Sequence, residues 1–294
     1  MGVCVDRLNL YTEVAQAASA DVIRQYSTSF GMASRVLKAD SRRHISNIYA
    51  LVRIADEIVD GVAAEAGLTP DAIRTILDDC EKETENALHT GYSSNLVIHA
   101  FATTARAVGI TTAETAPFFA SMRMDLTDTE YDEAGFARYV YGSAEVVGLM
   151  CLAVFVRGRN VSADEGRLLV KGARALGAAF QKVNFLRDLS ADAEGLGRSY
   201  FPGVTAHNLD EITKVRLVDD IDADLAAANA TLRLLPDDAA RAVALAHDFF
   251  AELSRRIRST PADQLLRARI SVPNLTKYLI AARIMLGFRS LTDK

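Results

Sequence analysis

Apolar residues recur at helical spacing through most of this chain, and one segment shows the pattern most clearly. Between residues 45 and 60 a single stripe holds the apolar positions, which are Ile45, Ile48, Leu51, Val52, Ala55 and Val59. Spacings of three and four residues place such positions on one face of an α-helix. A second segment, residues 177–192, reads in the same way. We therefore predict a helix over each segment.

Helix starts are marked by proline and by hydroxyl residues. Four prolines stand where a helix can begin: Pro70, Pro236, Pro261 and Pro273. Thr111 and Ser162 are each followed three residues later by Glu, which is the spacing of a capping box. These signals divide the chain into about ten helical segments, without alternating strand patterns between them. The sequence predicts an all-α protein with a single domain spanning residues 1–294.

Composition narrows the class of protein further. The 294 residues are 50% hydrophobic and 24% charged, with a formal net charge of −5, which excludes a disordered chain and argues against nucleic-acid binding. Three widely spaced cysteines form neither a disulfide framework nor a zinc pattern. The apolar runs are interrupted by charges before the length of a spanning helix, and the N-terminal residues do not resemble a signal peptide. We expect a cytoplasmic protein, with peripheral membrane contact left open.

Acidic and amide side chains are stacked on the two predicted helices. Asp56 and Asp60 lie four residues apart, so one stands a helical turn above the other. The second helix carries its column at spacings of three, four and four residues: Gln181, Asn184, Asp188 and Asp192. Oxygen ligands without His or Cys suit Mg²⁺, which keeps several waters and bridges to substrate phosphates. For either column alone, a solvated helix face is the simpler alternative.

Arginines flank both columns. Arg53 precedes Asp56 by three residues, and Arg187 is the neighbour of Asp188. Guanidinium groups bind phosphate in a bidentate manner and, together with Mg²⁺, would stabilise a departing diphosphate. The alternative is an ion pair within each helix.

A glycine-rich segment, residues 192–202, follows the second column. Loops of this composition near a site often serve as lids. Arg198 and Tyr200 in this segment are placed to fold back over the site.

These motifs together resemble those of the squalene and phytoene synthases, which join two prenyl diphosphates head to head. Order and spacing agree from residue 20 to residue 270. The matching stretches are residues 26–30, 49–53, 56–60, 122–126, 139–144, 181–188 and 197–202. The resemblance implies an isoprenoid synthase fold in which the two acidic motifs face each other across a central apolar cavity.

The resemblance also implies roles for individual residues. The implied metal ligands are Asp56 and Asp60 on one side and Asn184, Asp188 and Asp192 on the other, with Mg²⁺ as the cofactor and Mn²⁺ as its substitute. The implied substrate contacts are Tyr49, Arg53, Gln181, Arg187, Arg198 and Tyr200, and a flap formed by Tyr26, Ser27, Thr28, Ser29 and Phe30. Tyr141 matches a tyrosine that assists near the reacting carbons.

The implied reaction condenses two geranylgeranyl diphosphates to phytoene, through a cyclopropylcarbinyl diphosphate, in carotenoid biosynthesis. The chain looks most like bacterial phytoene synthases, for which NADPH is not expected. One alternative is dehydrosqualene or squalene synthesis from farnesyl diphosphate, where squalene synthases use NADPH. Others are a non-catalytic relative that serves as an assembly module, and an unrelated helical scaffold.

Several residues depart from the family pattern. Tyr26 stands where many relatives have His, Thr28 where some have Lys, and Glu145 where Gly is usual. A buried Glu145 would need a cationic partner or a raised pKa.

Prenyl diphosphates are the expected small-molecule partners of a monomer or homodimer, alongside upstream and downstream carotenoid enzymes. A basic stretch could face anionic lipid at the inner membrane surface, or form a solvated face: Arg35, Lys38, Arg42 and Arg43.

Overall fold

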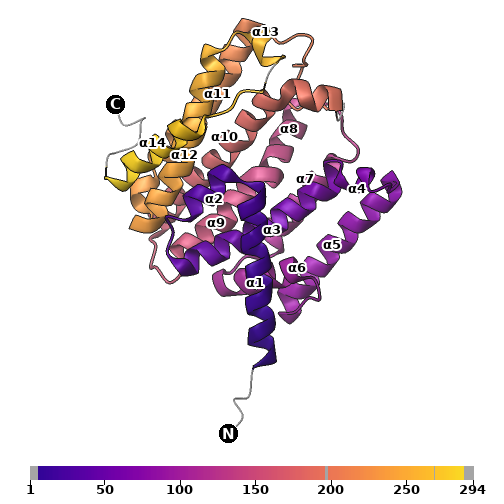
Figure 1. Cartoon of the computed structure of the whole chain (residues 1–294), viewed down its shortest axis with the longest axis vertical. Coiled ribbons are helices and arrows are strands. Elements are labelled where there is room, and N and C mark those ends of the chain that lie inside the picture. Colours follow the sequence, from indigo (N-terminus) through magenta and orange to yellow (C-terminus); the bar gives the residue numbers. More distant parts are fainter. Residues whose placement is uncertain (1–5, 196–197, 268, 288–294) are drawn as a thin grey trace.

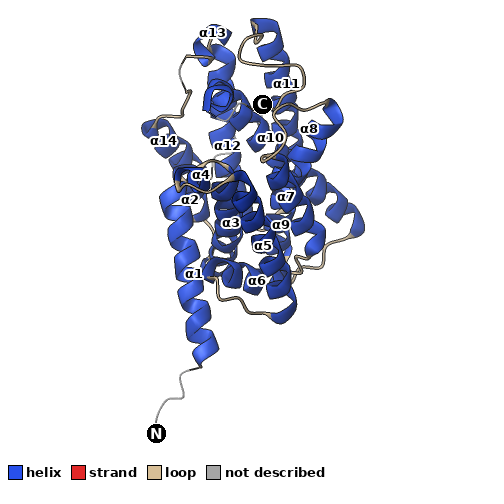
Figure 2. Cartoon of the chain, turned by 90° about the vertical axis from the view of Figure 1, so that its right-hand side faces the viewer, coloured by secondary structure: helices blue, strands red, loops and turns tan. Residues whose placement is uncertain are grey.

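The computed structural model describes residues 6–195, 198–267 and 269–287, and the side chains of residues 190–195 are not described. Within these ranges the chain is helical and without a strand, as predicted (Figures 1 and 2). The helices are α1 Arg7–Tyr26, α2 Thr28–Ser34, α3 Ala39–Val59, α4 Val62–Glu65, α5 Pro70–Thr90, α6 Leu96–Val108, α7 Thr112–Met124, α8 Glu133–Val140, α9 Val146–Val156, α10 Ala163–Gly195, α11 Glu211–Asn229, α12 Asp237–Ser259, α13 Ala262–Leu265 and α14 Asn274–Met285. A π-helical turn, η1 (Tyr141–Glu145), joins α8 to α9, and a 3-10 turn, η2 (Leu232–Leu234), follows α11.

Helices α12, α13 and α14 begin directly after Pro236, Pro261 and Pro273, as predicted, and two other predicted starts have side-chain caps. Pro70 begins α5, and the Thr69 side chain before it accepts a hydrogen bond from the amide of Ala72. Both hydrogen bonds of the capping box are present between Thr111 and Glu114 at the start of α7. The structure has more helices than the expected ten, because short elements such as α2, α4 and α13 are too brief to show a period.

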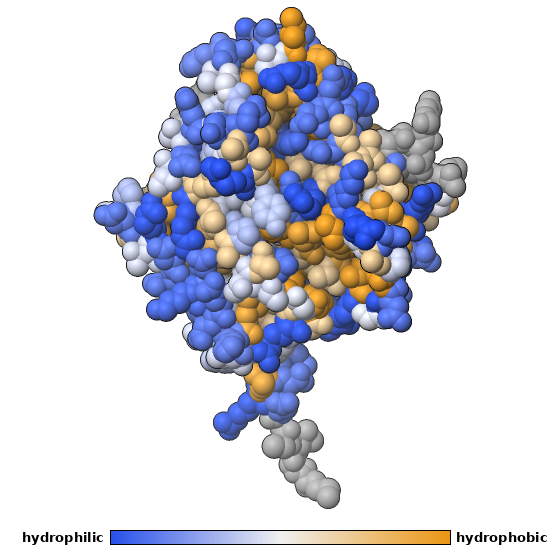
Figure 3. Space-filling model, turned by 180° about the vertical axis from the view of Figure 1, so that it is seen from behind, coloured by the Kyte–Doolittle hydropathy of each residue, from blue (hydrophilic) through white to orange (hydrophobic). Residues whose placement is uncertain are grey.

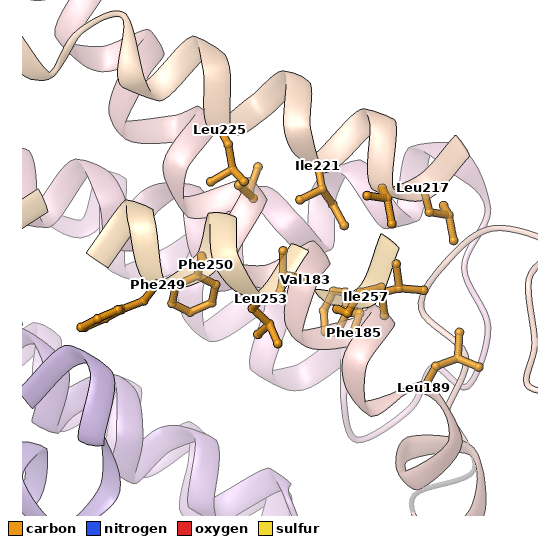
Figure 4. Close-up of a cluster of buried hydrophobic side chains, with 14 of the residues drawn as sticks. Val183, Phe185, Leu189, Leu217, Ile221, Leu225, Phe249, Phe250, Leu253 and Ile257 are labelled. Carbon is orange, nitrogen blue, oxygen red and sulfur yellow. The ribbon is translucent and has the colours of Figure 1, made fainter. Parts of the chain in front are cut away.

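The 33-residue helix α10 runs through the middle of the molecule (Figure 1). It packs against α11 and α12 on one side and against η1 and α9 on the other. Figure 4 shows the first of these contacts, where apolar side chains of α10, α11 and α12 interlock in one buried cluster. A second cluster joins α3, α5, α6, α7 and α9. Helix α10, which carries the second predicted column, therefore packs in the first cluster, and α3, which carries the first column, packs in the second.

Two glycines allow α10 to lie against its neighbours backbone to backbone. A Cβ atom on Gly148 would stand 2.4 Å from the carbonyl oxygen of Ala173 in α10. A Cβ on Gly177 would stand 2.5 Å from the carbonyl oxygen of Ala144 in η1. Since both neighbours are main-chain atoms, side chains at these positions would force the helices apart.

One helical stretch, Glu133–Val156, is long and apolar enough by length and composition to cross a membrane. In the fold it forms α8, η1 and α9, and 44% of its most apolar window is buried inside the protein. Glu145 interrupts this stretch as expected, but the expectation that no segment has the length and composition of a spanning helix does not hold for it. Here the stretch packs against α10.

The Gly177 contact predicts opposite effects for one substitution at two sites of α10. Gly177→Ala should lower the free energy of unfolding by about 1–3 kcal/mol because the new methyl group meets the Ala144 carbonyl. Gly166→Ala is the matched control, since its Cβ would find Val161 at 3.8 Å. That change should be neutral or stabilise the protein by about 0.5–1 kcal/mol. Urea denaturation of both variants measures the difference, and equal effects would contradict the contact.

Candidate active site

An apolar cavity lies between α3, α9, α10 and α12. It holds about 1380 Å³ that no protein atom occupies, part of it open to solvent. One wall is a stripe along α10 formed by Leu169, Gly172, Ala173, Leu176, Gly177, Phe180, Gln181 and Asn184. At a rise of 1.5 Å per residue, this wall is about 22 Å long. The opposite wall includes Ile45, Ile48, Tyr49 and Val52 of α3.

The first aspartate of each column lies one helical turn beyond a residue that lines the cavity. Asp56 follows the lining residue Val52 by four positions, and Asp188 follows Asn184 by four positions. The C-terminal ends of α3 and α10 are also close in space, because Arg198, just past α10, donates a hydrogen bond to Asp60, just past α3 (3.1 Å). The structure therefore brings the two predicted columns to one end of the cavity.

The first column is crowded with negative charge. Asp56 keeps 34% of its side chain exposed and accepts a hydrogen bond from Arg53 at 3.0 Å, while Arg53 also pairs with Glu57. Burial, and next the Asp60 carboxylate, raise the pKa of Asp56 to about 8, and the Arg53 charge only partly opposes this. A bound cation would strongly stabilise the ionised form of carboxylates whose pKa is raised in this way.

The second column is neutralised by arginines. Arg187 pairs with Asp188, and Arg269 donates to both oxygens of the same carboxylate at 2.8 and 3.2 Å. Although burial acts in the opposite direction, these two guanidinium groups hold the pKa of Asp188 below its ordinary value. The intrahelical ion pairs that the sequence left open are thus present on both helices. Arg269 is 81 residues from Asp188, and no sequence pattern identified it.

A divalent cation could bind at either column through oxygen ligands. Among the described side chains, no three of the His, Cys, Asp and Glu type converge into a complete metal site. Asn184 lines the cavity beside Asp188, whereas the side chain of Asp192, in the last turns of α10, falls outside the described part of the chain. A cation held by one or two of these carboxylates would complete its shell with water or substrate oxygens, as Mg²⁺ commonly does.

Arg198 and Tyr200 fold back against this end of the site, and they are buried rather than exposed. The Arg198 side chain is 6% exposed, and it donates to the carbonyl oxygens of Val59 (3.0 Å) and Asp125 (2.7 Å). Tyr200 stacks on Phe185 of α10 with 3.9 Å between ring centroids. Residues 198 and 200 of the predicted lid segment are therefore fastened to α3, α7 and α10, whereas residues 196 and 197 lie outside the described part of the chain.

Asp125 is a site residue that the spacing argument missed. Its carboxylate accepts hydrogen bonds from the hydroxyls of Tyr139 (2.9 and 2.8 Å) and Tyr200 (3.3 Å), and Arg198 lies 3.4 Å away. Burial raises the pKa of Asp125 to about 7, against the lowering effect of Arg198 and then of Tyr139. The stretch 122–126 matched the family, but Asp125 stands at the end of α7 rather than in a column within a helix, so the spacing argument did not single it out.

The flap residues take different places. Phe30 lines the cavity and packs against the rings of Tyr49, Phe180 and Phe250. Ser27 caps α2 by accepting a hydrogen bond from the amide of Phe30. The remaining flap residues do not line the cavity. Tyr26 is 54% exposed, and the Arg53 guanidinium lies over its ring. Thr28 and Ser29 form the first turn of α2.

Tyr141 is not among the residues that line the cavity. Its ring lies beneath the guanidinium of Arg174, 5.2 Å from the ring centroid, and Arg174 also pairs with Glu145. Glu145 therefore has the cationic partner that its burial requires. The role near the reacting carbons stays a prediction for Tyr141, while Tyr139, two residues earlier, reaches Asp125 beside the acidic columns.

Comparison with known proteins places this geometry in a family. A family model described as squalene/phytoene synthase matches residues 23–276. Phytoene synthase of Mycobacterium bovis is 31% identical over 302 residues, covering 92% of this chain and 91% of that protein. The 15-cis-phytoene synthase of Enterobacter agglomerans is 29% identical over 280 residues, with 87% and 90% covered.

Solved structures agree in fold. A dehydrosqualene synthase in complex with a ligand has a TM-score of 0.76 and 20% identity, covering 94% of this chain and 97% of that one. A squalene synthase from Alicyclobacillus acidocaldarius has a TM-score of 0.71 and 21% identity, covering 85% and 95%. The chain belongs to the squalene/phytoene synthase family, and it is a prenyltransferase with the all-α isoprenoid synthase fold that the sequence predicted.

The Arg198 contacts predict a large loss of stability when this charge is removed. Arg198→Met leaves Asp125 buried without its cation, so the free energy of unfolding should fall by about 3–5 kcal/mol. Arg167→Met is the control, because Arg167 and its partner Asp164 are both exposed and the change should cost less than about 1 kcal/mol. Thermal denaturation with limited proteolysis measures both variants. Similar melting temperatures would show that Arg198 is not a structural clamp.

Proposed function

We propose that this protein condenses two molecules of geranylgeranyl diphosphate head to head, giving phytoene through a cyclopropylcarbinyl diphosphate. The observation that carries the proposal is an apolar cavity with an α10 wall about 22 Å long, one end of which lies beside two acidic, arginine-flanked columns. Such a cavity suits a long hydrocarbon tail with a charged head group. Two relatives named phytoene synthases, each matched over about nine-tenths of both chains, favour the C20 substrate.

The charged end of the cavity would bind the diphosphate groups. Mg²⁺, or Mn²⁺ in its place, bound by Asp56 and Asp60 and by Asn184, Asp188 and Asp192, would supply positive charge to the departing diphosphate. Arg53 and Arg187, which pair with carboxylates of the columns, would turn to diphosphate oxygens when a cation occupies their acidic partners. Gln181, at the polar end of the cavity wall, would donate a hydrogen bond to the substrate.

The apolar walls would protect the carbocation that forms when an allylic diphosphate leaves. Water must be excluded, because it would capture the cation before the two prenyl chains join. The rings of Phe30, Tyr49 and Phe180 meet at the polar end of the cavity and present π-faces that stabilise a nearby positive charge. The buried clamp of Arg198 on Asp125 would keep the surrounding loops closed during the reaction.

Product analysis tests the proposal against the two alternatives that use a C15 substrate, dehydrosqualene synthesis and squalene synthesis. Solved structures of a dehydrosqualene synthase and a squalene synthase are similar in fold to this chain. Purified protein with Mg²⁺ and geranylgeranyl diphosphate, without NADPH, should yield a C40 hydrocarbon with a conjugated triene. A C30 product formed only from farnesyl diphosphate would instead assign dehydrosqualene synthesis. A C30 intermediate diphosphate that reacts further only with NADPH would assign squalene synthesis.

Single carboxylates of each column should be required for turnover. Asp56→Asn and Asp188→Asn should each reduce the rate at least about 100-fold, because the leaving diphosphate loses charge stabilisation, while the circular dichroism of the helices is unchanged. Asp164→Asn, at an exposed position of α10, is the control and should keep its rate.

The same variants distinguish an enzyme from a non-catalytic assembly module. Inorganic diphosphate with Mg²⁺ at about 100 times its dissociation constant should stabilise the wild type by about 2.7 kcal/mol, seen as a higher melting temperature. Asp56→Asn should lose most of this shift and Asp164→Asn should retain it. A wild type that neither binds diphosphate nor forms product would assign the assembly role.

A further inference from the structure

Helix α14 is apolar on two opposite faces, and only one of them is covered. Ile280 and Ile284 are buried against the core that α12 builds. The other face carries large hydrophobic side chains, each 60–75% exposed: Leu275, Tyr278, Leu279, Met285 and Leu286. Their spacings of three, one, six and one residues keep them on one stripe. A stripe of this kind in water marks a surface that contacts something else.

The charge around this stripe differs in sign from that of the whole chain. The chain has a net charge of −5, yet no acidic residue occurs between Asp263 and Asp293. The described cations of this interval are Arg267, Arg269, Lys277 and Arg283. The side chains of Arg267 and Arg269 are 78% and 67% exposed, and they pair with Asp263 and Asp188. The segment that carries the apolar stripe is thus positively charged overall, although Asp263 and Asp188 neutralise two of its arginines.

We propose that the exposed face of α14 docks this protein on the surface of a membrane that contains anionic lipid. Apolar side chains that enter the headgroup region, next to basic residues that face anionic lipid, are the two features of interfacial helices. A second copy of the chain fits this surface less well, because self-association would bring like charges together. A helix of 12 residues, about 18 Å long, is also short for a stable protein interface.

The position of α14 connects this surface with the active site. Arg269, five residues before the helix, holds Asp188 of the second column. On the side of α14 away from the stripe, burial and then the charge of Arg187 lower the pKa of Lys277. Figure 3 shows the back of the molecule, where hydrophobic residues gather in a separate patch among hydrophilic ones. Docking through this face would therefore hold the charged end of the cavity close to the lipid surface.

Cosedimentation of the whole chain with vesicles tests the surface. Wild type should bind vesicles of phosphatidylcholine with about 30% phosphatidylglycerol, and binding should weaken in high salt and on pure phosphatidylcholine. Leu275→Ser with Leu279→Ser should lower the partition coefficient by about tenfold or more, since two side chains lose their burial in the interface. The matched control is Leu8→Ser with Ile212→Ser, two side chains of α1 and α11 that are 57% and 81% exposed; it should bind like wild type.

Three outcomes would overturn the inference. The first is an equal response of both double variants, and the second is no vesicle binding by the wild type. The third is a wild-type dimer that only Leu275→Ser with Leu279→Ser dissociates in sedimentation velocity, which would assign the face to a second copy. Circular dichroism confirms folding of each variant. Turnover of prenyl diphosphate in detergent micelles should be unchanged in both pairs, so failure of the docking surface is distinguishable from failure of the proposed reaction.

Discussion

The rest of the structure depends on the contact between the backbone of α10 and the backbones of η1 and α9. Glycine at positions 148 and 177 lets main-chain atoms of these helices approach where any side chain would intervene. With α10 fixed there on one flank and against α11 and α12 on the other, its lining stripe has no rotational freedom. This close backbone contact therefore fixes the position of the cavity wall on α10. It also fixes the acidic column that continues the wall and the partners of that column.

A second constraint is the concentration of carboxylates at the end of an apolar chamber. A guanidinium group lies near each of three carboxylates, those of Asp56, Asp125 and Asp188. The three arginines, Arg53, Arg198 and Arg269, come from different parts of the chain. The balance is unequal, since the pKa of Asp56 and of Asp125 is raised while that of Asp188 is lowered. The first column therefore has the greater electrostatic need for a bound cation. Arginine suits this arrangement because it can exchange a carboxylate for a phosphate with the same geometry.

The sequence predicts the parts of the site that local periodicity determines. Asp56 follows Val52, and Asp188 follows Asn184, by one helical turn, so the columns and their place at the end of apolar stripes follow from spacing alone. Arg269 and Asp125 could not be found in this way, because their contacts to Asp188 and Arg198 join residues that tertiary packing alone brings together. Tyr139 and Tyr141 show a finer limit. Two residues along a helix turn a side chain by about 200°, so the motif cannot place both rings on one face. Only the packing of α8 and η1 decides which of them meets Asp125.

One continuous helix, α10, carries both the charged end of the cavity and its far end. The helix therefore fixes the distance between these two ends. Leu169 near its beginning and Asn184 at the polar end are separated by a fixed number of turns. A shift of either end along the axis would need an insertion, which would rotate the carboxylates away from α3 by about 100° per residue. Exchanging bulk at the end of the cavity far from the carboxylates, around Leu169, Leu235 and Phe155, would change the length it accepts without moving them. The charged end can then stay the same while the length of hydrocarbon tail that the cavity accepts changes.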